Sequence, residues 1–126
     1  MTDAPTLSML VTQIPDGIRV EVSGLSTYEN TVAYWRGIVS EVTLRAPRNL
    51  LLIDRTVGDA LSGDEWRALV ATLVGSVLGS VRVAHVKPDG LEQLEYCELH
   101  ALEAGLTARV FYDEAQAILW LRHGER

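Results

Sequence analysis

The sequence predicts an α/β fold with a mixed, mostly parallel sheet of about five strands, an N-terminal β-hairpin and four helices. Short runs rich in Val, Ile and Leu alternate with longer segments whose apolar residues recur every three or four positions. One short run, residues 49–54 (NLLLID), is apolar almost throughout, which is typical of a strand buried on both faces of a sheet. Strands separated by helices are expected to be parallel neighbours joined by right-handed crossovers.

The first two elements predict the hairpin. Residues 7–14 and 18–24 flank the turn PDG, in which Pro15 and Gly17 are expected to supply the special backbone angles. Apolar and polar residues alternate through the second segment from Ile18 onward. This alternation indicates one buried and one solvent-facing side, and it predicts an outer strand of the sheet.

The next segment predicts the first helix, followed by the buried strand 49–54. Ser26 and Glu29 have the spacing of a capping box, and Pro47 is expected to end the helix. Its apolar residues share one stripe: Tyr28, Val32, Trp35, Val39 and Val42.

The second helix begins after a loop that bears glycine. Ser62 and Glu65 repeat the capping-box spacing, and Gly79 is the expected stop. Its predicted core-facing residues are Trp66, Leu69, Val70, Leu73, Val74 and Val77. All three tryptophans (Trp35, Trp66 and Trp120) fall on apolar stripes or at their margins, so core packing is their predicted role.

The last third of the chain predicts two strands and two helices. Residues 81–86 (VRVAHV) and 108–112 (ARVFY) have the composition of strands. Between them, residues 91–105 form an acidic amphipathic pattern that predicts the third helix. Asp113 and Gln116 have capping spacing and predict the start of a short final helix.

Composition limits the classes of function. The 126 residues fit a single domain spanning 1–126, and the net charge of −6 without a basic cluster argues against nucleic acid as a partner. Cys97 is the only cysteine, which excludes an intrachain disulfide, and no motif implies a metal or cofactor. The uncharged run 68–81 is shorter than the roughly 20 residues of a membrane-spanning helix. The N-terminus lacks the pattern of a signal peptide, so a cytoplasmic protein that is not transmembrane is expected.

The loop after residues 49–54 is the strongest candidate for a binding site. In an open α/β sheet, ligands bind beyond the carboxyl ends of the parallel strands, and free N–H groups at a helix start favour an anion. The candidate residues there are Asp54, Arg55, Ser62, Gly63, Asp64 and Lys87. The alternative, which we favour for Ser62, is that it only caps the helix, because the neighbouring carboxylates would repel an anion. Lys87 is either a partner for an anion or, as we prefer, a solvated turn residue.

A second candidate is the pair formed by Cys97 and His100. Their three-residue spacing places them on one face of the predicted third helix, as a nucleophile and its base would require. No orienting group or oxyanion site is evident, and a buried cysteine acting as a small hydrophobe is the simpler explanation. His85 lies within an apolar strand and is predicted to be a hydrogen-bonded core or rim residue.

The order of elements, with NLLLID followed by a loop and a long helix, then VRVAHV, then ARVFYDEAQAILWLR, resembles the STAS domain family, and most closely its SpoIIAA-like branch. The resemblance implies a non-enzymatic regulatory or interaction module. In phospho-regulated members a kinase acts on a serine within an Asp-Ser-Ser-Gly-like run. Here Asp54 matches the acid at the strand end and Ser62-Gly63 lies near the helix start, whereas the serine doublet is missing and the loop is longer.

The resemblance also bears on partners. It implies another protein or a small or lipidic ligand, and it makes Ser62 the candidate phosphorylation site. Sheet edges and apolar helix faces are also available for self-association as a homodimer.

Overall fold

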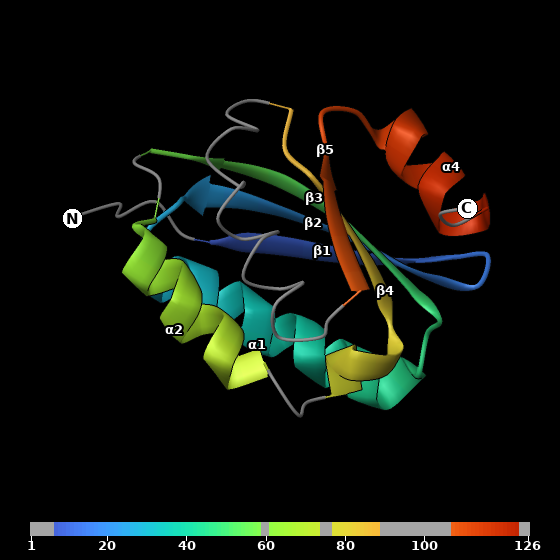
Figure 1. Ribbon diagram of the computed structural model, residues 1–126, viewed down its shortest axis with the longest axis horizontal. Coiled ribbons are helices and arrows are strands. Elements are labelled where there is room, and N and C mark those ends of the chain that lie inside the picture. Colours follow the sequence, from blue (N-terminus) through green and yellow to red (C-terminus); the bar gives the residue numbers. More distant parts are fainter. Residues whose placement is uncertain (1–6, 59–60, 74–76, 89–106, 124–126) are drawn as a thin grey trace.

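The computed structural model describes residues 7–58, 61–73, 77–88 and 107–123, and it is an α/β structure built on one five-stranded mixed sheet (Figure 1). The strands are β1 (Ser8–Ile14), β2 (Gly17–Leu25), β3 (Asn49–Val57), β4 (Arg82–Val86) and β5 (Thr107–Phe111). The helices are α1 (Tyr28–Arg45), α2 (Gly63–Leu73), α4 (Glu114–His123) and the 3-10 turn η1 (Val77–Ser80). The strand order is β1-β2-β3-β4-β5, in which only the β1–β2 pair is antiparallel.

Helices cover both faces of the sheet. In Figure 1, α1 and α2 lie on one side of the strands and α4 lies on the other. The part of the chain that the structure describes contains three α-helices, and the helix predicted over residues 91–105 lies outside it. Among the described residues, no helix is long and apolar enough to cross a membrane.

β3 is the centre of the core, as its apolar run predicts. Leu50 and Leu52 belong to the cluster under α1 and α2, whereas Leu51 and Ile53 belong to the cluster under α4. The strand is longer than the predicted 49–54, because its pairing with β2 continues to Val57.

The prediction that the second strand is an outer strand is wrong. β2 lies between β1 and β3, and β1 is the edge strand. The polar side of β2 arises because α4 packs on β3, β4 and β5 rather than on β2. Arg19 on that side reaches only the start of α4, where its Nε lies 2.8 Å from a carboxylate oxygen of Glu114.

In the hairpin turn, the residue with the unusual backbone angle differs from the prediction. Asp16 has a φ of 63°, in the left-handed region that Asp tolerates better than most residues. Gly17 instead allows its backbone to lie close to that of Asn49, because a Cβ at position 17 would lie 2.3 Å from the carbonyl oxygen of Asn49. Glycine at position 17 therefore lets the hairpin lie against the start of β3.

Two of the predicted helix boundaries need correction. Thr27, not Ser26, caps α1, since its hydroxyl accepts from the backbone N–H of Asn30 at 3.1 Å. The structure describes α2 over Gly63–Leu73, and Gly79, the expected stop, lies instead within the 3-10 turn η1. The cap of α4 is confirmed: Asp113 accepts from the N–H of Gln116 at 3.0 Å.

Candidate functional site

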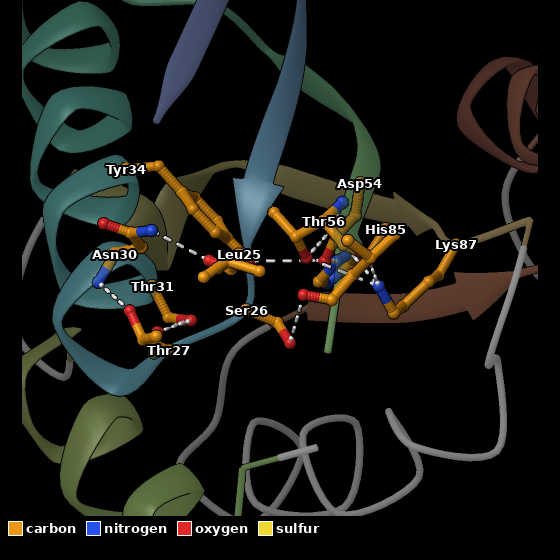
Figure 2. Close-up of polar contacts among 11 residues, drawn as sticks. Leu25, Ser26, Thr27, Asn30, Thr31, Tyr34, Asp54, Thr56, His85 and Lys87 are labelled. Atoms are coloured by element: carbon orange, nitrogen blue, oxygen red, sulfur yellow. Dashed lines mark hydrogen bonds and ion pairs between the residues drawn. The ribbon is translucent and has the colours of Figure 1, made fainter. Parts of the chain in front are cut away.

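A cluster of buried polar side chains lies at the carboxyl ends of β3 and β4. The parallel pairing places Leu52 opposite His85, so the residues two positions further along point to the same side of the sheet. Asp54 and Thr56 come from β3, and His85 and Lys87 come from β4 and the position just after it. Figure 2 shows these side chains gathered together, with Tyr34 extending toward them from α1. We call these five residues the Asp54 cluster.

The carboxylate of Asp54 is the acceptor at the centre of this cluster. Its Oδ2 lies 2.8 Å from Nε2 of His85 and accepts from the hydroxyl of Tyr34 at 3.3 Å. Its Oδ1 accepts from the backbone N–H of Thr56 at 3.0 Å and from the hydroxyl of the same residue. With an exposed fraction of only 3%, the carboxylate obtains its hydrogen bonds from the protein rather than from solvent.

Lys87 is buried, which corrects the preference for a solvated turn lysine. Its exposed fraction is 5%. Its Nζ donates to the carbonyl oxygen of Thr56 at 2.8 Å and contacts Oδ1 of Asp54 at 3.4 Å. Its backbone N–H donates to the carbonyl of Phe111 at 3.0 Å. Pairing with β5 therefore continues past the end of β4 and keeps the side chain directed toward the helices.

The cluster keeps Asp54 ionised. Burial raises the pKa of its carboxyl group, but the hydrogen bond and charge of His85, the charge of Lys87 and the hydroxyl of Thr56 together outweigh burial. The net result is a pKa well below the ordinary value of an aspartate. Such a weakly basic, enclosed carboxylate is poorly suited to general-base chemistry and well suited to holding β3, β4 and α1 in fixed relative positions.

The prediction for His85 is confirmed. The side chain is 2% exposed, its Nε2 is hydrogen-bonded to Asp54, and its ring also packs edge-on with Trp35 at 6.2 Å between ring centroids. The roles of Tyr34, Thr56 and His85 in the cluster were missed from sequence. Strand parity is the signal that could have found two of them, because Asp54 and Thr56, like His85 and Lys87, are two apart.

The other predicted site residues lie away from this cluster. Arg55 points to the opposite face, is half exposed, and pairs with Glu21 at 2.7 Å. Asp64 is exposed and pairs with Arg67 at 3.1 Å within the first turn of α2. Gly63 is the first residue of α2, with open space where a Cβ would lie.

Ser62 forms the predicted capping box. Its hydroxyl accepts from the backbone N–H of Glu65 at 3.1 Å, and the carboxylate of Glu65 accepts from the backbone N–H of Ser62 at 2.9 Å. A carboxylate therefore already occupies part of the position that an anion would take at this helix start. Within the described ranges, no hydrogen bond or ion pair joins Ser62 to the Asp54 cluster.

The described part of the chain contains neither a metal site nor the Cys97–His100 pair. Within residues 7–58, 61–73, 77–88 and 107–123, no group of three or more His, Cys, Asp or Glu side chains could hold a metal ion. Cys97 and His100 lie outside the described residues.

No protein-family model matches the chain, and no curated protein matches its sequence.

The capping box makes a direct prediction. Replacing Ser62 with Ala is expected to lower the free energy of unfolding by about 1 kcal/mol, because the N–H of Glu65 loses its acceptor. Urea unfolding followed by far-UV circular dichroism measures this change. Ser62→Asn keeps an acceptor at the same position and is expected to retain most of the stability. Equal losses in the two variants would show that the hydroxyl is not acting as a cap.

Proposed function

We propose that this protein is a non-enzymatic binding module of the STAS type, which docks a protein partner on the rim formed by the carboxyl ends of its strands. The observation that carries the proposal is a pair of exposed apolar side chains on that rim. Leu25 and Val57 are register partners at the ends of β2 and β3, with exposed fractions of 38% and 60%. Tyr112, directly after β5, is 66% exposed at the same end of the sheet.

The Asp54 cluster supports binding rather than catalysis at this rim. Its ionisable groups are almost fully buried and satisfy one another, so none of them is presented to a substrate. The cluster joins β3, β4 and α1 directly below the rim, which holds Val57 on a rigid support. A pre-organised surface loses less conformational entropy when a partner docks.

The resemblance to phospho-regulated STAS proteins suggests how docking is controlled. A phosphate on Ser62 would displace the carboxylate of Glu65 from the capping box and would add negative charge beside Asp64. The first turn of α2, which begins six residues after Val57 in the sequence, would then rearrange. Modification of Ser62 is therefore proposed to weaken docking rather than to create a new anion site.

The test compares capture of binding partners by two matched charge variants. Val57→Glu places a carboxylate on the rim. Leu44→Glu places one near the end of α1, at the opposite end of the strands, where the side chain is 79% exposed. We expect proteins captured from a lysate of the source organism by the wild type to be retained by Leu44→Glu and reduced at least about tenfold by Val57→Glu.

Two results would contradict the proposal. One is equal capture by both variants, and the other is no specific capture by the wild type. Thermal unfolding of both variants controls for folding, and both are expected to melt close to the wild type because each replaces an exposed side chain.

A further inference from the structure

A groove lies between α1 and α2, and none of its lining residues belongs to the rim described above. Its volume is about 470 Å³, within the range of small-molecule sites and toward its lower end. The apolar lining consists of Val32, Trp35, Val39, Leu69 and Leu73. Arg36, Ser40 and Thr72 are the polar residues that line it. Figure 1 shows the two helices on the same face of the sheet.

Trp35 lines this groove with a side chain that is almost completely buried. The side chain is 4% exposed, and no residue in the described part of the chain accepts a hydrogen bond from its buried Nε1. The indole nitrogens of Trp66 and Trp120 are also without a described acceptor, but neither residue lines the groove. A buried donor without an acceptor costs free energy, so each such group calls for a physical explanation.

Arg36 brings an unpaired positive charge. Arg19, Arg45, Arg55 and Arg67 each form an ion pair with a carboxylate. Arg36 is exposed and forms no ion pair or hydrogen bond with the residues that the structure describes. One helical turn to either side of it lie Val32 and Ser40, and no acid is among the described lining residues. The chain as a whole carries a net charge of −6, so it is distinctive that the described lining of this groove contains an arginine and no acidic residue.

We propose that this groove binds a small monocarboxylate with an apolar, aryl or alkyl body. The body lies along the half-buried side chains of Val32 and Val39, beside Trp35, where it is removed from water. The carboxylate pairs with the guanidinium of Arg36, whose planar fork fits the two oxygens of a carboxyl group. The proposal rests on a different surface from the rim and stands or falls independently of the proposed docking function.

The structure also supplies a route by which occupancy reaches the Asp54 cluster. The ring of Trp35 packs against His85, and the adjacent Tyr34 donates to Asp54. A ligand that contacts Trp35 is therefore expected to perturb the resonances of the His85 ring as well, which gives a second readout of binding.

The experiment uses the three tryptophans as reporters. The 126-residue chain, labelled with 15N, is titrated with 4-phenylbutyrate, and the indole N–H signals are followed by two-dimensional NMR. The Trp35→Phe variant assigns the signal of Trp35. We expect a saturable shift of the Trp35 signal that is larger than the shifts of Trp66 and Trp120. The uncharged analogue 4-phenylbutan-1-ol is expected to bind about tenfold more weakly, because it cannot pair with Arg36.

Two matched arginine variants test the charge. Arg36→Gln is expected to weaken 4-phenylbutyrate about tenfold and to leave binding of the alcohol unchanged. Arg67→Gln, on the exposed side of α2, is expected to leave both affinities unchanged. The amide spectra of the two variants verify folding. The proposal is overturned if 4-phenylbutyrate gives no saturable shift of Trp35, if the acid and the alcohol bind equally, or if the two variants behave alike.

Discussion

Replacing Asp54 with Ala is expected to lower the free energy of unfolding by about 3–5 kcal/mol. The substitution leaves Lys87 and His85 almost fully buried without the carboxylate that they contact at 3.4 Å and 2.8 Å. It also removes the carboxylate oxygens that accept from the hydroxyls of Tyr34 and Thr56. Urea unfolding at pH 7, followed by circular dichroism, measures the loss.

The neighbouring residue on the same strand is a matched control. Arg55→Gln removes a charge whose side chain is 51% exposed and whose partner is Glu21, so it is expected to cost less than about 1 kcal/mol. Asp54→Asn keeps the shape and one acceptor oxygen and is expected to fall between the two. If Asp54→Ala costs no more than Arg55→Gln, the cluster does not support the fold.

The lowered pKa of Asp54 adds a dependence on pH whose sign can be stated. Because the carboxyl pKa is lower in the folded than in the unfolded chain, the charge of Asp54 contributes fully above the unfolded value of about 3.9. The contribution is lost as the pH falls below that value toward the folded pKa. The stability difference between the wild type and Asp54→Asn is therefore expected to be smaller at pH 3 than at pH 6, by about 1 kcal/mol. A difference that is constant between these two pH values would contradict the ionised state of Asp54.

The features that sequence predicted correctly depend on short stretches of chain. The run 49–54 predicts a strand covered on both faces, because side chains alternate in a strand and the four consecutive positions 50–53 are all apolar. The capping box of Ser62 and Glu65 follows from the geometry of a single helical turn. Such local rules also placed Asp54 and Lys87 at the same rim.

The features that were missed depend on contacts between distant segments. Lys87 is buried because β5 pairs with its backbone N–H and because the carbonyl of Thr56 lies within reach of its Nζ, and neither partner is near it in sequence. Tyr34 reaches Asp54 only because α1 packs on the face of the sheet to which the Asp54 side chain points. The choice between Ser26 and Thr27 as the cap of α1 is not resolved by spacing, because both side chains have the chemistry of a cap and they are adjacent.

The coverage of the sheet on both faces gives the second large expected effect. Leu52→Ala and Ile53→Ala are each expected to lower the free energy of unfolding by about 2–5 kcal/mol. The two side chains are adjacent in β3 and point to opposite faces, and their exposed fractions are 0% and 1%. Urea unfolding at pH 7 measures both losses. Should either variant fail to fold, Ile53→Val gives a milder test of the face under α4, with an expected cost of about 0.5–1.5 kcal/mol.

The neighbouring strand supplies the contrast that makes this result specific. In β2 only one face is packed under helices, so Ile18→Ala is expected to cost about 2–5 kcal/mol, whereas Glu21→Ala, on the other face, is expected to cost less than about 1 kcal/mol. Both substitutions in β3 are expected to cause large losses of stability, because helices cover both faces of that strand. In β2 only Ile18→Ala is expected to do so, because α4 packs on β3, β4 and β5 and leaves the other face of β2 largely uncovered. A small loss for Ile53→Ala would mean that α4 does not cover the sheet in solution, and the polar side of β2 would then need another explanation.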